Sequence, residues 1–166
     1  MIEEARQSHP MITYEKGTYR FNYRVAGLFL YNHRALLHRT EMDDFWSLPG
    51  GRVHFMESSE KTIQREMKEE MGIQVDILRL LWIVENFFEY EDKKNHEICL
   101  YYLLKLPKDS SLLNTQEFTG NEEGLKILFK WFPIEQLEDL ELYPSFLRTE
   151  IGNLPDHVEH IVHVDE

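Results

Sequence analysis

The sequence has little cysteine, no basic run and no long apolar segment, and each shortage excludes a class of protein. Its single cysteine, Cys99, cannot form an internal disulfide, and the apolar run 98–102 around it predicts a buried structural thiol. No apolar run is long enough to cross a bilayer, and the acidic segment 1–5 does not resemble a signal peptide. These absences favour a cytoplasmic protein without a membrane partner.

The charge balance argues against a long nucleic acid as the partner. The formal net charge is −12, and an acidic surface repels the phosphate backbone of DNA or RNA unless a local basic patch offsets it. No run rich in lysine or arginine is present. A small polyphosphate stays compatible with this charge, because metal ions can neutralise both the ligand and an acidic site.

The length of 166 residues suits one domain spanning 1–166, with residues 1–12 as a polar lead-in. Strands mixed with a few helices indicate an α/β fold with a mixed sheet. We expect a short strand pair around Gly17 in 13–23, strands over 24–31, 34–39, 97–106 and 126–132, one or two strands within 73–88, and helices over 59–71, 133–137 and 143–151.

The helix expected over 59–71 has clear signals at both ends. Before it, the glycines of the Leu48–Gly51 segment break regular structure and allow close backbone approach. Ser58 can cap the first turn, and Gly72 is well placed to end the helix.

Helix geometry places two glutamates of this segment beside its apolar face. Successive residues turn by about 100°, so Ile63, Met67 and Met71 form one apolar stripe. Glu66 and Glu70 then stand at the rim of that stripe. A glutamate cluster is usually a solvated face, but carboxylates at a partly buried rim repel one another strongly.

Something positive should offset this repulsion, to which Glu69 adds because it lies beside Glu66. A hard divalent cation such as Mg²⁺ takes oxygen ligands and is often shared with substrate phosphates. Arg65, four residues before Glu69, can supply part of the positive charge, and the glycine-rich turn can bring a backbone carbonyl close to the same metal. Such a site suits hydrolysis, because a metal activates both water and a phosphoryl oxygen.

Residues 51–73 resemble the Nudix box, G-x5-E-x7-R-E-U-x-E-E-x-G-U, where U is a bulky apolar residue. Every specified position matches. The matching residues are Gly51, Glu57, Arg65, Glu66, Met67, Glu69, Glu70, Gly72 and Ile73. The resemblance implies a Nudix fold, an α/β/α sandwich in which the box forms a loop–helix–loop.

The resemblance also implies a Mg²⁺ site, with Mn²⁺ as a possible substitute. Its ligands would be Glu66, Glu69 and Glu70, with the Gly50 carbonyl as a possible addition. We take Glu69 as the general base within the box. Arg65 and Glu57 would form an ion pair that orients loop and helix, either as part of the catalytic arrangement or as a purely stabilising pair.

The implied reaction is attack of water on a nucleoside diphosphate linked to another group. Nucleoside triphosphates and dinucleotide polyphosphates are favoured, the latter because Tyr90 stands at a tyrosine spacing found in hydrolases of diadenosine polyphosphates. A sensor of the same fold that binds a nucleotide without cutting it, and an enzyme acting on RNA 5′ ends, remain alternatives. Many relatives dimerise, so a homodimer is possible.

Three charged residues outside the box are candidates for substrate contact. Arg24 and Arg39 bracket two core strands and match phosphate oxygens in geometry, although ordinary surface salt bridges are the commoner use. Glu97, at the start of a strand, can contact substrate or act in catalysis, or lie at a strand end on the surface.

Overall fold

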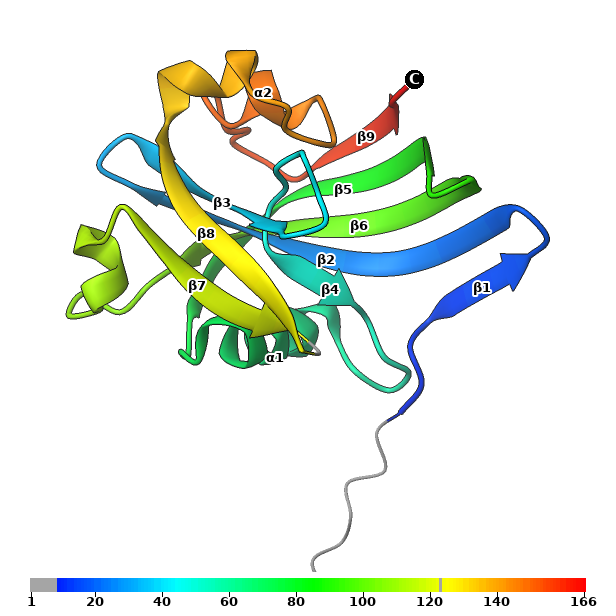
Figure 1. The fold of residues 1–166 in the computed structure, drawn as a ribbon, viewed down its shortest axis with the longest axis horizontal. Coiled ribbons are helices and arrows are strands. Elements are labelled where there is room, and N and C mark those ends of the chain that lie inside the picture. Colours follow the sequence, from blue (N-terminus) through cyan, green and yellow to red (C-terminus); the bar gives the residue numbers. More distant parts are fainter. Residues whose placement is uncertain (1–8, 123) are drawn as a thin grey trace, which may run out of the picture.

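The fold, seen in a computed structural model that describes residues 9–122 and 124–166, is built on one mixed sheet. Its strands run in the order β7-β8-β3-β2-β6-β5-β9, and β1 and β4 also pair with β2 (Figure 1). The β2–β6 and β5–β9 pairs are parallel, and the other pairs are antiparallel. The α/β class with a mixed sheet is therefore confirmed.

The strands are β1 (Thr13–Lys16), β2 (Tyr19–Tyr31), β3 (Arg34–Thr40), β4 (Gly50–Arg52), β5 (Asp76–Tyr90), β6 (Lys93–Lys105), β7 (Glu117–Glu122), β8 (Leu125–Pro133) and β9 (Glu159–Val164). The helical elements are α1 (Ser59–Met71), α2 (Leu147–Glu150) and the 3-10 helices η1 (Ser111–Asn114) and η2 (Ile134–Asp139).

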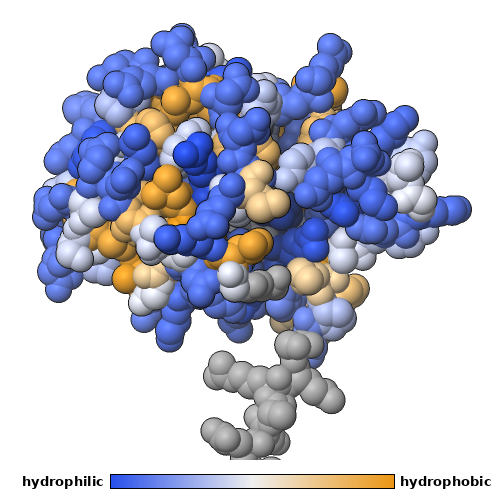
Figure 2. Space-filling model, viewed as in Figure 1, coloured by the Kyte–Doolittle hydropathy of each residue, from blue (hydrophilic) through white to orange (hydrophobic). Residues whose placement is uncertain are grey.

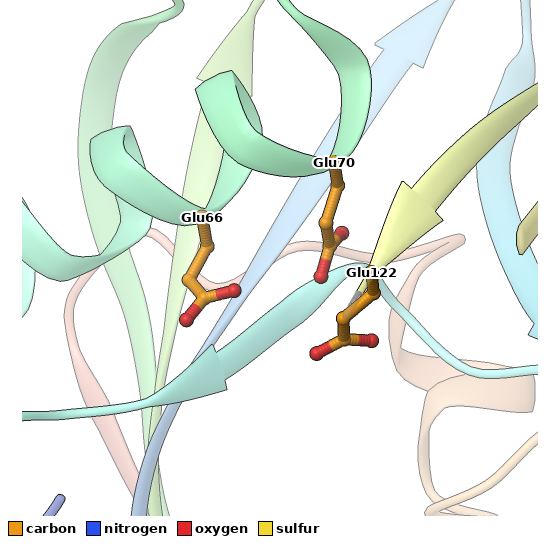
Figure 3. A group of neighbouring side chains, drawn as sticks. All are labelled: Glu66, Glu70 and Glu122. Atoms are coloured by element: carbon orange, nitrogen blue, oxygen red, sulfur yellow. The ribbon is translucent and has the colours of Figure 1, made fainter. Parts of the chain in front are cut away.

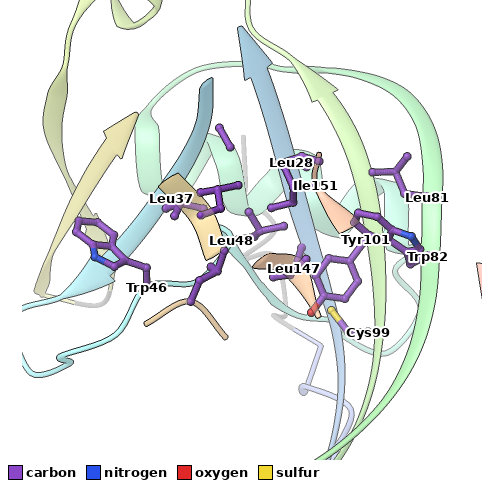
Figure 4. Close-up of a cluster of buried hydrophobic side chains, with 14 of the residues drawn as sticks. Leu28, Leu37, Trp46, Leu48, Leu81, Trp82, Cys99, Tyr101, Leu147 and Ile151 are labelled. Carbon is purple, nitrogen blue, oxygen red and sulfur yellow. The ribbon is translucent and has the colours of Figure 1, made fainter. Parts of the chain in front are cut away.

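Helices cover both faces of the sheet. Because side chains alternate along a strand, Val25 and Phe29 of β2 face α1 and pack with Ile63 and Met67. Leu28 of β2 belongs to the opposite core, which α2 and η2 close. Figure 4 shows this second core, where Leu147 and Ile151 approach Leu28 and Tyr101. The layers match the sandwich expected from the box.

The box helix α1 has the bounds that the sequence predicts. Ser58 lies at its N-cap and accepts a hydrogen bond from the Lys61 backbone N–H at 3.2 Å. Gly72 ends the helix in the left-handed region, with φ of 73°, which glycine adopts without steric cost. These caps fix where the helix begins and ends, and so which of its residues face the sheet.

The one or two strands expected within 73–88 are one strand, β5, which continues to Tyr90. Other elements differ from the sequence expectation, and the helix expected over 143–151 is reduced to α2. Pro144 disfavours a helical conformation for Tyr143, so the expected helix does not begin at that residue. β4, β7 and β9 were not predicted. The glycines of β4 were expected to break regular structure, and β7 contains a single large apolar residue, Phe118, and so carries little strand signal.

The outer surface agrees with the acidic, polar composition. Hydrophilic residues cover most of the face shown in Figure 2, and apolar residues appear there only in small groups. Within the described part of the chain, no helix is both long and apolar enough to span a membrane.

Candidate active site

Three carboxylates from two elements meet at one end of the sheet. Glu66 and Glu70 project from α1, and Glu122 stands at the end of β7 (Figure 3). One oxygen of each lies within 4.8 Å of one oxygen of the other two. The side chains of Glu66 and Glu70 are buried, with only 7% and 3% of each residue exposed. We refer to Glu66, Glu70 and Glu122 as the carboxylate cluster.

Two glycines allow this close approach. A Cβ atom at Gly120 of β7 would lie 2.3 Å from the backbone carbonyl oxygen of Glu70, so only glycine lets β7 lie this close to the end of α1. A Cβ atom at Gly51 would lie 2.2 Å from the carboxyl carbon of Glu66. The glycine of β7 therefore brings Glu122 to the cluster, and the glycine of the box leaves room for Glu66.

Burial makes the cluster electrostatically unfavourable on its own. It raises the pKa of Glu66 to about 7 and that of Glu70 to about 9, and the neighbouring carboxylates add to both shifts. Within the described part of the chain, both carboxylate oxygens of Glu70 are buried without a hydrogen-bond partner. A buried unpaired acceptor is unfavourable, so the cluster suits a ligand that supplies positive charge. Clustered carboxylate oxygens are the donors that hard divalent cations take.

The ion pair between Arg65 and Glu57 is present and joins α1 to the loop before it. The guanidinium donates from Nε to Glu57 Oε2 at 2.9 Å and from Nη2 to Glu57 Oε1 at 3.0 Å. The hydroxyl of Thr62 also donates to Glu57, at 2.7 Å. Hydrogen bonds from Arg65 chiefly hold the pKa of Glu57 down to about 2. Arg65 further donates to Glu66 Oε1 at 2.9 Å, so it orients one member of the cluster.

Glu69, expected to bind the metal and to act as base, lies outside the carboxylate cluster as the described residues form it. Its side chain is 59% exposed, and Arg65 Nη1 contacts its carboxylate at 3.3 Å. The structure thus brings Glu66 and Glu70 together with Glu122 instead of Glu69. Its metal-binding role stays a prediction, and its position beside the cluster is compatible with the role of base.

Gly50 retains a carbonyl that is directed away from its neighbouring strand. In the β2–β4 pair, the flanking backbone bonds run from the N–H of Gly27 to the carbonyl of Pro49 and from the N–H of Val53 to the carbonyl of Tyr23. Gly50 therefore occupies a non-hydrogen-bonded position in the antiparallel pair, and its carbonyl points away from β2. It remains a candidate ligand.

A cleft of about 1140 Å³ opens next to the cluster, and Arg24, Arg52 and Glu97 line it. Arg24 and Glu97 form an ion pair with 3.9 Å between Nε and Oε2. Arg24 lines the cleft, and its charge lowers the pKa of Glu70, which burial otherwise raises, so the cleft and the cluster are electrostatically coupled. Two of the three candidates outside the box thus lie together in the cleft.

Arg39, the third candidate, lies elsewhere. Its guanidinium packs over the ring of Trp46, 4.8 Å from the ring centroid, and Arg39 is absent from the cleft lining that the described residues form. The structure gives this arginine a cation–π contact and does not bring it to Arg24.

Glu122 is the cluster member that sequence reasoning missed. It follows Phe118 and Gly120 in a short, polar segment in which exposed and half-buried residues alternate, and no fixed spacing connects it to the box. The one local signal is an isolated glycine within an alternating segment, which indicates close approach of another backbone.

Comparison with protein-family models identifies one family that matches most of the chain. The model described as NUDIX domain matches residues 21–149, which is most of the chain. Curated relatives include proteins named RNA pyrophosphohydrolase from Haemophilus influenzae, 28% identical over 104 residues, and from Pasteurella multocida, 26% identical. The matched region is 55% of this chain and 53% and 52% of these relatives, so the chain spans about half of their length.

Solved structures agree with the fold. A structure titled UDP-X diphosphatase superposes with a TM-score of 0.56 at 19% identity, covering 84% of this chain and 66% of the other. The mutator MutT protein from Bacillus halodurans superposes with a TM-score of 0.56 at 14% identity, covering 86% and 89%. Together with the complete box on α1 and the family match over 21–149, this shows that the chain belongs to the NUDIX domain family.

Proposed function

We propose that the protein is a Mg²⁺-dependent hydrolase that cleaves a pyrophosphate linkage in a nucleotide-like small molecule. The observation that carries this proposal is the carboxylate cluster, in which two buried glutamates of the box helix meet Glu122. Family membership supports hydrolysis, because relatives carry the name RNA pyrophosphohydrolase and a similar fold is titled UDP-X diphosphatase.

Glu66, Glu70 and Glu122 would hold Mg²⁺, or Mn²⁺ in its place, with the Gly50 carbonyl as a further ligand. A divalent cation bound there would polarise a phosphoryl oxygen and lower the pKa of the attacking water. Arg65 orients Glu66 through its 2.9 Å hydrogen bond, and Glu57 holds Arg65 in place from the other side.

The remaining residues would bind the substrate or accept the proton of the attacking water. Arg24 would bind the diphosphate from the cleft side, since a guanidinium matches phosphate oxygens in geometry. Glu69, exposed beside the cluster, would accept the proton of the water that attacks phosphorus. The anhydride P–O bond then breaks and the phosphate of the other half leaves. Glu97 would contact the part of the substrate that extends into the cleft.

The size of the cleft suits a nucleotide. Small-molecule sites commonly measure about 300–1,000 Å³, and this cleft, at about 1140 Å³, is slightly larger and so has room for a nucleotide. We favour nucleoside triphosphates and dinucleotide polyphosphates as substrates. An RNA 5′ end would need the same chemistry, but the net charge of −12 opposes binding of a long backbone.

A substrate panel tests the proposal. Nucleoside triphosphates, dinucleotide polyphosphates, nucleotide sugars, ADP-ribose and a 5′-triphosphorylated RNA are incubated with Mg²⁺, and products are separated by chromatography. We expect metal-dependent cleavage of one class by the native protein and by Glu60→Gln, an exposed control on the same helix. Glu70→Gln should lose activity on the order of 10²-fold while keeping its fold. Absence of cleavage across the panel, or full activity of Glu70→Gln, would refute the proposal.

A further inference from the structure

Three buried polar residues form a row across neighbouring strands on the floor of the cleft. Asn22 of β2 pairs in register with Glu97 of β6, and Glu97 pairs with Asn86 of β5. Residues paired in this way point to the same side of a sheet. All three line the cleft, and each is less than a tenth exposed. Such residues need hydrogen-bond partners, because burial removes water from them.

Among the described residues, the side-chain oxygens of these three differ in their hydrogen-bond partners. Asn22 Oδ1 accepts a hydrogen bond from the hydroxyl of Thr13 at 2.8 Å. Within the described chain, Asn86 Oδ1 is buried and has no partner. The carboxylate of Glu97 meets the guanidinium of Arg24 at 3.9 Å, which is longer than a hydrogen bond. In the part of the chain that the structure describes, Asn86 Oδ1 lacks a partner and the Glu97 carboxylate has only this long ion-pair contact, so both oxygens can accept hydrogen bonds from a ligand with donors.

Aromatic side chains line another part of the same cleft. The ring of Phe45 meets Tyr90 and Tyr143 edge-on, with 5.8 Å between centroids in each pair. The Tyr90 hydroxyl donates to Asp43 Oδ1 at 2.9 Å, which ties the loop of Phe45 to the end of β5. Apolar ring surface beside a polar floor suits a flat group with a hydrogen-bonding edge.

We propose that Asn86 and Glu97 are specificity-determining residues that select a substrate presenting two neighbouring hydrogen-bond donors beyond its diphosphate. This inference rests on the proposed function, in which Arg24, a residue of the cleft lining, would bind the diphosphate. Two sources offer this chemistry. Guanine presents its N1–H and N2–H₂ groups side by side, and ribose presents two adjacent hydroxyls.

Binding of nucleoside monophosphates separates the two sources. These ligands contain no anhydride bond, so binding is measured without turnover, by calorimetry in Mg²⁺. IMP lacks the 2-amino group of GMP, and dGMP lacks the 2′-hydroxyl. If Asn86 and Glu97 bind the guanine base, GMP should bind about tenfold more tightly than IMP. If they bind the ribose hydroxyls, GMP should bind about tenfold more tightly than dGMP.

Variants test whether Asn86 and Glu97 cause the preference for GMP over IMP or dGMP. Asn86→Ala should remove it, and Glu97→Gln, which keeps the shape of the side chain, should reduce it even if Asn86→Ala folds poorly. Asn114→Ala, an exposed asparagine on η1, is the matched control and should behave as the native protein.

Three results would overturn this inference: equal binding of all three ligands, no binding of any at millimolar concentration, or a preference that survives both variants. A selective cleft in a protein that cleaves nothing would refute the proposed function and leave the inference standing. Cleavage of a substrate by a protein that binds GMP, IMP and dGMP equally would support the proposed function and refute the inference.

Discussion

Glu70 is the residue at which stability and function conflict most directly. Both of its carboxylate oxygens are buried without a partner among the described residues, and burial raises its pKa to about 9. In a metal-free protein at neutral pH this side chain therefore keeps its proton, although an exposed glutamate would have lost it. Residues that destabilise a fold in this way are typical of functional sites.

This conflict predicts how stability changes with pH. Because the folded pKa of Glu70 lies above the unfolded value of 4.5, the folded state binds more protons between these values, and the free energy of unfolding falls as pH rises. From pH 5 to pH 8, Glu70 would contribute a loss of about 3–4 kcal/mol in EDTA. Glu70→Gln should remove much of this loss in urea titrations. Glu69→Gln, whose side chain is 59% exposed, should not. An unchanged pH dependence in Glu70→Gln would contradict the burial argument.

At the scale of elements, the Glu57–Arg65 ion pair fixes the loop of the box against α1. Its two parallel hydrogen bonds and the contact from Thr62 give a rigid, charge-assisted junction. The same guanidinium reaches Glu66, so the junction and the carboxylate cluster share one residue. A displacement of the loop before α1 would therefore move Arg65 and, with it, Glu66 of the carboxylate cluster.

Removing this junction should cost stability in a pH-dependent way. Glu57→Gln should lower the free energy of unfolding at pH 7 by about 1–3 kcal/mol, because it leaves Arg65 without its bidentate partner. The pKa of Glu57 is depressed to about 2, so its contribution is present above pH 4.5 and is lost as pH falls towards 2. Urea unfolding at pH 7 and pH 3 should show a smaller gap between variant and native protein at the lower pH. Glu60→Gln, in the first turn of the same helix, serves as control.

The contact between β7 and α1 gives a second prediction at this scale. Gly120→Ala would put a methyl group where only 2.3 Å is available to the carbonyl of Glu70, so β7 must move away and carry Glu122 with it. We expect Mn²⁺ affinity to fall by about tenfold or more and the melting temperature to drop. Gly152→Ala, whose added carbon would meet its nearest neighbour at an ordinary 3.5 Å, should leave affinity unchanged. Equal Mn²⁺ affinity of both variants would show that β7 does not position a ligand.

At the scale of the whole molecule, local patterns predicted what is encoded locally. The box helix had the expected bounds because its cap, apolar stripe and terminal glycine agree with one another. The turn at Asn32 and His33 and the strand ends beside it were placed correctly, because an apolar run, a turn and a second run follow directly in sequence, whereas β2 begins at Tyr19 and not at Arg24.

What depends on contacts between distant segments was not predictable. Glu122 reaches the cluster because β7 pairs with β8 and because Gly120, which has no Cβ atom, lets β7 approach α1. Neither feature gives a periodic pattern in the sequence. The same holds for Asn86, which becomes a floor residue only through its register with Glu97. Helix geometry placed Glu66 and Glu70 on the buried side of α1, whereas the choice between Glu69 and Glu122 as third member required the tertiary structure.

A Mn²⁺ titration followed by electron paramagnetic resonance tests the carboxylate cluster most directly, because it needs no knowledge of the substrate. The native protein and Glu117→Gln, an exposed glutamate at the other end of β7, should bind Mn²⁺ equally. Glu70→Gln and Glu122→Gln should each bind it at least about tenfold more weakly, with the fold checked by circular dichroism. Binding by Glu122→Gln that equals native binding would contradict a cation site made of Glu66, Glu70 and Glu122.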